Sequence, residues 1–158
     1  MITKKIVLLA FSLFIGVSMS AQILTPAKWS VSVSKKHPKQ GEIVELIFTV
    51  KLDATWHLYS NKQSYDLGPL PTTFEFEAND SYMLLGDMQA IGVKKTHDEV
   101  FEVVVNYFEE KAEFRQKVKI LSSKVTIMGS YEYQVCTTVD GKCILERDEF
   151  EFEMEPTK

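Results

Sequence analysis

The chain has few of the residues that build metal centres: its 158 residues include only two cysteines and three histidines, His37, His57 and His97. These residues show neither the C-x-x-C nor the H-x-x-x-H spacing typical of zinc sites. We therefore expect neither a metal nor another cofactor, and we expect each histidine to lie on the surface or in a loop. A serine hydrolase has no support either, because no G-x-S-x-G or comparable elbow occurs.

Basic residues and long apolar runs are also scarce. Lys and Arg number 18 against 22 Asp and Glu, whereas a nucleic-acid partner requires clustered Lys and Arg. The one long apolar run, residues 6–17, is too short to span a bilayer comfortably. We expect a soluble protein with no nucleic-acid partner and no membrane insertion.

The apolar run belongs to a segment with the layout of a secretory signal peptide. Lys4 and Lys5 precede it and small residues follow it. Residues 1–21 are therefore predicted to be removed, after Ser20 or Ala21, although an uncleaved N-terminal anchor is the alternative. No cysteine follows the site, which argues against a lipoprotein. A periplasmic or secreted location is expected.

Residues 22–158 contain no internal repeat, low-complexity tract or linker, and are predicted to form a single domain. Apolar residues alternate with polar ones over short segments, and no window sustains a helical period. Eight or nine such strands predict an all-β fold, an immunoglobulin-like two-sheet antiparallel sandwich. The segments are Trp29–Val33, Val44–Val50, Trp56–Ser60, Thr73–Glu77, Tyr82–Leu85, Val100–Phe108, Phe114–Ile120, Tyr131–Val135 and Phe150–Met154.

Two segments lack the strand pattern. Residues 61–71 hold two prolines and a glycine and predict a long ordered loop. Residues 87–98 are predicted to be a second irregular stretch. Loops of this length in a compact domain are often functional. The acidic run 146–155 favours an edge strand with a charged outer face.

The two cysteines, Cys136 and Cys143, are close in sequence and would meet an oxidising compartment. A two-residue turn at 140–141 would place Cys136 opposite Leu145, out of register with its partner. A four-residue turn over 138–141, with glycine in a left-handed conformation, would place the cysteines directly opposite each other. Opposed residues lie within disulfide range, so a bond is feasible, but the residues leave the register open.

Four motifs carry a resemblance to a known family: Trp-His-Leu-Tyr-Ser at 56–60, the proline-rich loop at 69–71, His-Asp-Glu-Val-Phe at 97–101 and Tyr-Gln-Val-Cys at 133–136. Together they resemble the N-terminal periplasmic domain of DsbD, of the thiol:disulfide interchange protein family, over roughly residues 28–152. The resemblance implies an immunoglobulin-like sandwich, in agreement with the strand pattern.

The resemblance also implies an electron shuttle. In the family, a membrane-embedded cysteine pair reduces a thioredoxin-like domain, which reduces the immunoglobulin-like module. That module in turn reduces periplasmic disulfide isomerases and cytochrome-maturation thioredoxins. The expected partners are thus thioredoxin-like periplasmic proteins and a separate membrane reductant, with the chain as a monomer and a component of a protein-disulfide reductase.

The resemblance further assigns roles to the cysteines. Cys143 would form the mixed disulfides and Cys136 would resolve them. The chain departs from the family pattern by having Ile144 and Leu145 where two prolines often follow the second cysteine, and by a longer spacing between the cysteines.

Residues near the pair receive roles by the same resemblance. Tyr59 would lie beside the cysteines. Asp98 and Glu99 would keep the thiols protonated, because nearby negative charge disfavours thiolate. A cap over the pair falls at Val100 or Phe101, and Phe101 is the better shield.

Two functions therefore stand. One is a periplasmic thiol–disulfide exchange module that relays electrons between thioredoxin-like proteins through Cys136 and Cys143. The alternative is a non-catalytic exported immunoglobulin-like binding module, in which Cys136–Cys143 is a structural disulfide. Such a short staple would contribute roughly 2.5 kcal/mol by loop closure. His57 and Tyr59 would line a solvated face on the second reading and a partner surface on the first.

Overall fold

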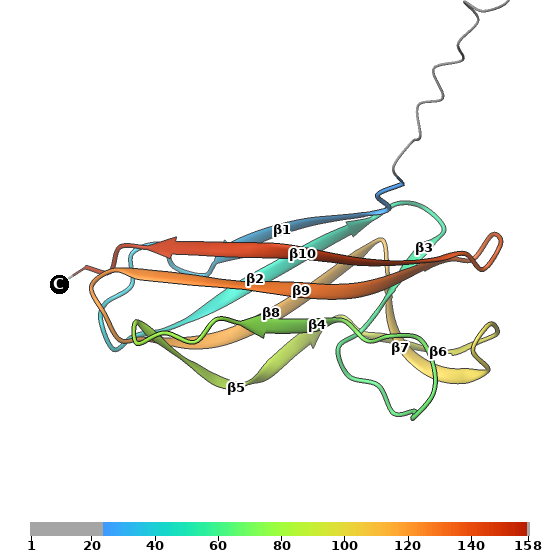
Figure 1. Ribbon diagram of the computed structural model, residues 1–158, viewed down its shortest axis with the longest axis horizontal. Coiled ribbons are helices and arrows are strands. Elements are labelled where there is room, and N and C mark those ends of the chain that lie inside the picture. The colour runs from blue at the N-terminus through green and yellow to red at the C-terminus, as the bar shows by residue number, and fades with distance from the viewer. Residues whose placement is uncertain (1–23, 158) are drawn as a thin grey trace, which may run out of the picture.

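A computed structural model describes residues 24–157, which form ten strands arranged as two antiparallel sheets (Figure 1). The predicted signal peptide, residues 1–21, lies outside the described residues. Among residues 24–157, no helix is long and apolar enough to cross a membrane.

The two sheets differ in size. The smaller has the order β1-β2-β8-β5, and the larger has the order β10-β9-β3-β7-β6, with β4 also paired to β9. The first comprises β1 (Ala27–Val33), β2 (Ile43–Leu52), β8 (Lys111–Ile120) and β5 (Tyr82–Ile91). The second comprises β10 (Cys143–Met154), β9 (Val125–Thr137), β3 (Trp56–Tyr59), β7 (Val103–Glu109), β6 (Lys94–Asp98) and β4 (Thr73–Phe76).

The hydrophobic core lies between the sheets and follows from the period-2 pattern. Along β2, alternate residues from Val44 to Val50 are buried while their neighbours are not, as expected where one face of a strand meets the core. The ring of Phe48 packs against Phe150 of the opposite sheet, with centroids 5.0 Å apart. This arrangement confirms the predicted immunoglobulin-like two-sheet antiparallel sandwich.

Two sequence expectations about local structure were wrong. Residues 87–98 are not irregular: they complete β5, turn at Gly92 and form β6. The alternation is hidden because β5 changes register between Leu85 and Gln89, and because β6 is an exposed edge strand. The strand expected from Val100 begins only at Val103, after a turn.

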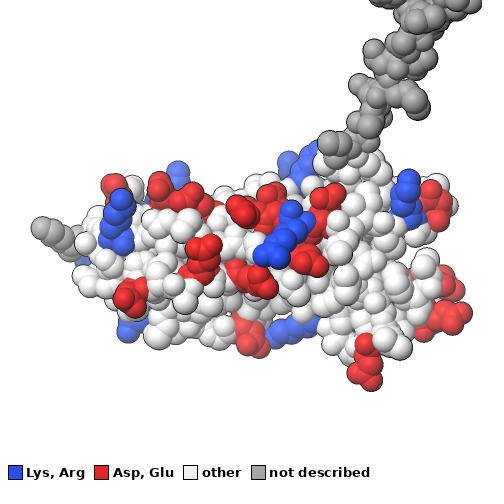
Figure 2. Space-filling view, viewed as in Figure 1, with Lys and Arg blue, Asp and Glu red and all other residues white. Residues whose placement is uncertain are grey.

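Other expectations are confirmed. Residues 61–71 form a loop without strands, and β10 is an edge strand with acidic residues at four of its six exposed positions. In the view of Figure 2, basic side chains lie singly among acidic ones along the sandwich.

Candidate functional site

The two cysteines form a disulfide at the turn end of the β9–β10 hairpin. Cys136 and Cys143 are directly opposed in the register. The turn between them spans four residues, closed by hydrogen bonds from Thr137 N to Lys142 O at 2.9 Å and from Gly141 N to Thr137 O at 3.1 Å. Gly141 has a φ of 68°, in the left-handed region that favours glycine. The structure thus selects the four-residue turn from the two registers left open by the sequence.

The disulfide lies on the outer face of the six-stranded sheet, away from the main core. Along β9, Val135 points into the core and Cys136 to the opposite side, where it clusters with Tyr59 and Val105. Cys136 is only 2% exposed, whereas Cys143 is partly exposed. Cys143 is therefore the more exposed residue of the pair.

A row of four residues crosses this outer face on neighbouring strands. Cys143 on β10 is opposite Cys136 on β9, which is opposite His57 on β3, which is opposite Glu109 on β7. Directly opposed residues share one face of the sheet and have Cβ atoms about 4.5–5.5 Å apart. Strand pairing alone therefore brings an imidazole beside the buried cysteine.

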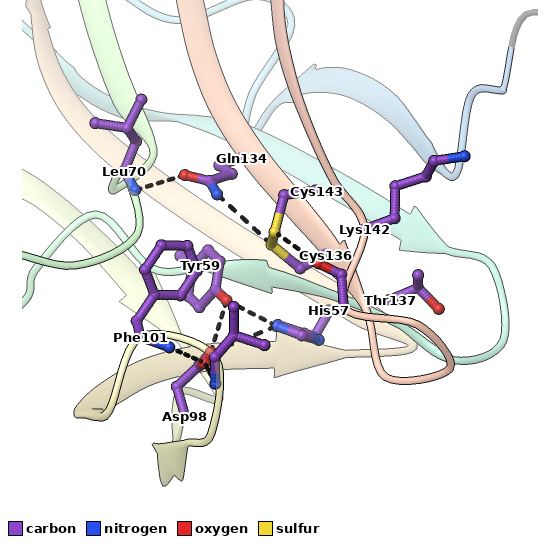
Figure 3. The surroundings of a disulfide bond; sticks show 12 residues. His57, Tyr59, Leu70, Asp98, Phe101, Gln134, Cys136, Thr137, Lys142 and Cys143 are labelled. Atoms are coloured by element: carbon purple, nitrogen blue, oxygen red, sulfur yellow. Dashed lines mark hydrogen bonds and ion pairs between the residues drawn. A yellow bond between two sulfur atoms is a disulfide. The ribbon is translucent and has the colours of Figure 1, made fainter.

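His57 belongs to a hydrogen-bonded chain with Tyr59 and Asp98 (Figure 3). Nε2 of His57 lies 3.0 Å from the hydroxyl of Tyr59, and that hydroxyl donates to Oδ2 of Asp98 at 2.7 Å. The expectation of a surface or loop position for His57 was wrong, because its side chain is only 14% exposed and lies on a strand. Tyr59 is fully buried, which also excludes a solvated face for this side chain.

Burial and hydrogen bonding set the protonation of this chain. Burial lowers the pKa of His57, although the carboxylates of Asp98 and Glu109 act in the opposite direction. Burial by itself would raise the pKa of Asp98, but the hydrogen bonds from Tyr59 and two backbone amides outweigh it and hold that pKa below its ordinary value. Burial, with the neighbouring Asp98, raises the pKa of Tyr59. At neutral pH the carboxylate is charged and the phenol is neutral.

Asp98 also holds the turn that follows it. Its Oδ1 accepts hydrogen bonds from the backbone amides of Val100 at 2.9 Å and Phe101 at 3.1 Å. The ring of Phe101 meets that of Tyr59 edge to face, with centroids 6.2 Å apart, and joins the cluster around the cysteines. One carboxylate thus connects the turn 98–102 to the tyrosine beneath it.

Gln134 is a further neighbour of the disulfide, one for which the sequence predicted no role. Its Oε1 accepts a hydrogen bond from Leu70 N at 2.7 Å, which turns Nε2 toward the sulfur of Cys136 at 3.6 Å. The loop 61–71 is thereby tied to the disulfide (Figure 3). The available signal was the position of Gln134 two residues before Cys136, which puts both side chains on the same face of a strand.

A cavity of about 350 Å³ opens beside the disulfide. Its lining includes Cys136, His57, Tyr59, Asp98 and Glu99. The structure therefore brings four of the six predicted site residues to one hollow, while Cys143 and Phe101 lie next to it in the cluster around Tyr59. Within residues 24–157, no group of three or more His, Cys, Asp or Glu side chains is arranged to hold a metal ion.

Comparison with known proteins gives a family and a fold. Residues 20–154 match the family described as the N-terminal domain of the thiol:disulfide interchange protein DsbD. No curated protein matches the sequence.

Two solved structures are similar to the chain. The N-terminal periplasmic domain of ScsB from Proteus mirabilis superposes with a TM-score of 0.60 at 15% identity, covering 84% of this chain. The chain spans 49% of that protein's length. The reduced N-terminal domain of DsbD from Neisseria meningitidis gives a TM-score of 0.48 at 16% identity, covering 79% of this chain and 83% of the other. At these identities the likeness to ScsB shows a shared fold.

Proposed function

Since this chain belongs to the family of DsbD N-terminal domains, we propose that it is a thiol–disulfide exchange module that relays electrons between thioredoxin-like proteins. The observation that carries the proposal is the disulfide Cys136–Cys143 on the outer face of the sheet, with Cys143 partly exposed and Cys136 buried. A staple in the inter-sheet core would have no such access.

The unequal exposure supports separate roles for the cysteines. In exchange, a partner thiolate attacks one sulfur of the disulfide and the other sulfur leaves as a thiolate. Cys143 is the more exposed residue of the pair, so we assign to it the attack that forms the mixed disulfide. Cys136 is buried and remains within the protein as the resolving thiol.

The acidic neighbours control when this chemistry occurs. Asp98 is charged and lines the same cavity as Cys136, and Glu99 stands at the exposed rim of that cavity. Negative charge near a thiol disfavours the thiolate. The reduced pair therefore stays protonated, and unreactive, until a partner docks.

The turn 98–102 acts as the cap. Phe101 packs over Tyr59 in the cluster that contains both cysteines, and the exposed Val100 extends toward Gly141 of the hairpin. A partner displaces this turn to reach the disulfide fully. The hydrogen bonds that Asp98 accepts from the backbone of the turn resist that movement and limit reaction with small oxidants.

We further propose a periplasmic location for this exchange, with residues 1–21 as a signal peptide and residues 22–158 as the domain. The DsbD family and the periplasmic ScsB domain support the location. The upstream donor is a membrane reductant and the downstream acceptors are thioredoxin-like periplasmic proteins, with the module acting as a monomer.

The reduction potential of the Cys136–Cys143 pair tests the proposal. Equilibration in dithiol redox buffers, followed by thiol quantification, is expected to give a value above about −270 mV, in the range of exchangeable couples. The variant with both cysteines replaced by serine controls for reagent binding elsewhere. A value below about −300 mV is typical of structural disulfides and would leave a binding module with a staple.

A further inference from the structure

His57 is an ionisable side chain that strand pairing places beside the buried cysteine. It is opposite Cys136 in the β3–β9 register, and both residues line the cavity beside the disulfide. Opposed side chains in an antiparallel pair point to the same face. The position of His57 is therefore set by the same backbone hydrogen bonds that set the position of Cys136.

The neighbouring tyrosine determines which nitrogen of His57 carries a proton. The hydroxyl of Tyr59 has one hydrogen, which it donates to Asp98 at 2.7 Å. Its oxygen can then only accept from Nε2 of His57, 3.0 Å away. Neutral His57 is thus protonated on Nε2, and Nδ1 is left with a free lone pair.

We propose that His57 is the base that accepts the proton of Cys136 when the disulfide closes. This inference rests on the proposed function. Thiolate, not thiol, is the nucleophile. Cys136 is 2% exposed in the oxidised protein, so at this buried position little water is available to take its proton. His57 supplies a proton acceptor inside the protein.

Cys143 and Cys136 react in turn. The thiolate of Cys143 first attacks a partner's disulfide, and one partner sulfur leaves as a thiolate. Cys136 then gives its proton to Nδ1 of His57, and its sulfur attacks the sulfur of Cys143. The bond from Cys143 to the partner breaks and the second partner sulfur leaves with the electron pair. The protein's pair is oxidised, the partner's disulfide is reduced, and His57 releases its proton to the departing thiolate or to water.

The electrostatics around His57 suit this role. Burial lowers its pKa, so it is an unprotonated base at neutral pH. The carboxylates of Asp98 and Glu109 stabilise the imidazolium formed during the step. His57 lines the cavity beside the disulfide and a second cavity next to it. The ionisable groups that contact His57 or line these two cavities are Tyr59, Cys136, Tyr107, Glu109, His97, Asp98, Glu99, Asp53 and Glu110.

The reaction of the reduced protein with excess 5,5′-dithiobis(2-nitrobenzoate) separates the two steps. The first nitrothiobenzoate is released when Cys143 attacks, and the second when Cys136 resolves the mixed disulfide. Stopped-flow absorbance is measured across about pH 5–9, which spans the ordinary pKa values of histidine and cysteine. We expect the rate constant of the second phase to fall in acid, because His57 is then protonated and cannot accept the proton of Cys136. The rate constant of this phase should reach a plateau at pH values above the titration of His57.

The variant His57→Gln tests the role of the base without removing the contact to Tyr59. A glutamine side chain offers an N–H donor near the position of Nε2 but has no basic nitrogen. At neutral pH we expect the rate constant of the second phase to fall by at least about tenfold. It should then rise with pH without reaching a plateau, because hydroxide takes the proton of Cys136 in place of His57. The first phase should change by less than about twofold. His37→Gln, at an exposed histidine away from the cavity, should match the wild type in both phases.

The inference would be overturned if His57→Gln showed the same rate constant for the second phase as the wild type, with the same plateau at high pH. If the variant does not fold, the wild type still tests the inference. The pH at which the rate constant of its second phase begins to fall must coincide with the titration of His57, followed by NMR in the reduced protein. A fall at a different pH overturns the inference. Failure of the proposed function looks different, because wild type would then release no nitrothiobenzoate in the first phase, or would not form the intramolecular disulfide.

Discussion

Replacing Cys143 by serine is expected to abolish mixed-disulfide formation, whereas replacing Cys136 by serine is expected to trap it. In Cys136→Ser, the accessible thiol still attacks a partner's disulfide, but no second thiol resolves the product. In Cys143→Ser, the remaining thiol has the buried position of Cys136. Its reaction should be slower by on the order of 100-fold, since buried thiols are poorly reactive. Mass spectrometry of the protein after reaction with the nitrobenzoate disulfide measures both outcomes.

The double serine variant is the control for these experiments. All three variants lose the cross-link and with it roughly 2.5 kcal/mol of loop-closure stabilisation, so their denaturant unfolding curves should agree. If Cys143→Ser formed the adduct as fast as Cys136→Ser, the assignment of the attacking thiol would be wrong. If neither single variant formed an adduct, while both remained folded, the exchange function itself would be contradicted.

Replacing Asp98 by alanine is expected to lower the free energy of unfolding by about 3 kcal/mol, because three hydrogen bonds to a buried carboxylate are lost. Asp98→Asn should cost less, about 1 kcal/mol, since its amide oxygen can still accept from the turn. Denaturant unfolding of the oxidised protein measures both. Asp87→Asn is the matched control, because Asp87 pairs with Lys62 in solvent and should change stability little.

Acid should narrow the difference between the wild type and Asp98→Asn. The pKa of Asp98 is lower in the folded protein than in the unfolded chain. Its stabilising contribution is therefore fully present above the unfolded value of about 3.9 and is lost as pH falls through the lower folded value. Unfolding curves at neutral pH and in acid test this. If the free energies of unfolding of the wild type and Asp98→Asn differed equally at neutral pH and in acid, the charge of Asp98 would not contribute to stability.

Asp98→Ala should also free the turn 98–102. Both backbone amides that Asp98 holds lie in this turn, which carries Phe101 over Tyr59. We expect the oxidised variant to be reduced faster by a small dithiol than the wild type, because the cap opens more often. An unchanged rate would show that the turn does not limit access to the disulfide.

Some features of this protein could be predicted because they depend on local sequence. Alternation of apolar and polar residues identified β2 and β10, since a strand with one buried face repeats every two residues. It failed at β6, where both faces of an edge strand are largely exposed and no alternation is visible. The motif 97–101 identified Asp98 as a site residue. It did not predict the hydrogen bonds that Asp98 accepts from the hydroxyl of Tyr59 and from the backbone of the turn 98–102.

The all-β class and the two-sheet sandwich were thus determined by the sequence itself. Only the tertiary structure decided which cysteine is buried, that Gln134 contacts the disulfide and that His57 stands beside Cys136. These features depend on the register between strands that are distant in the chain. Register is set by the packing of whole strands against one another, and a shift of one residue would turn every side chain to the other face.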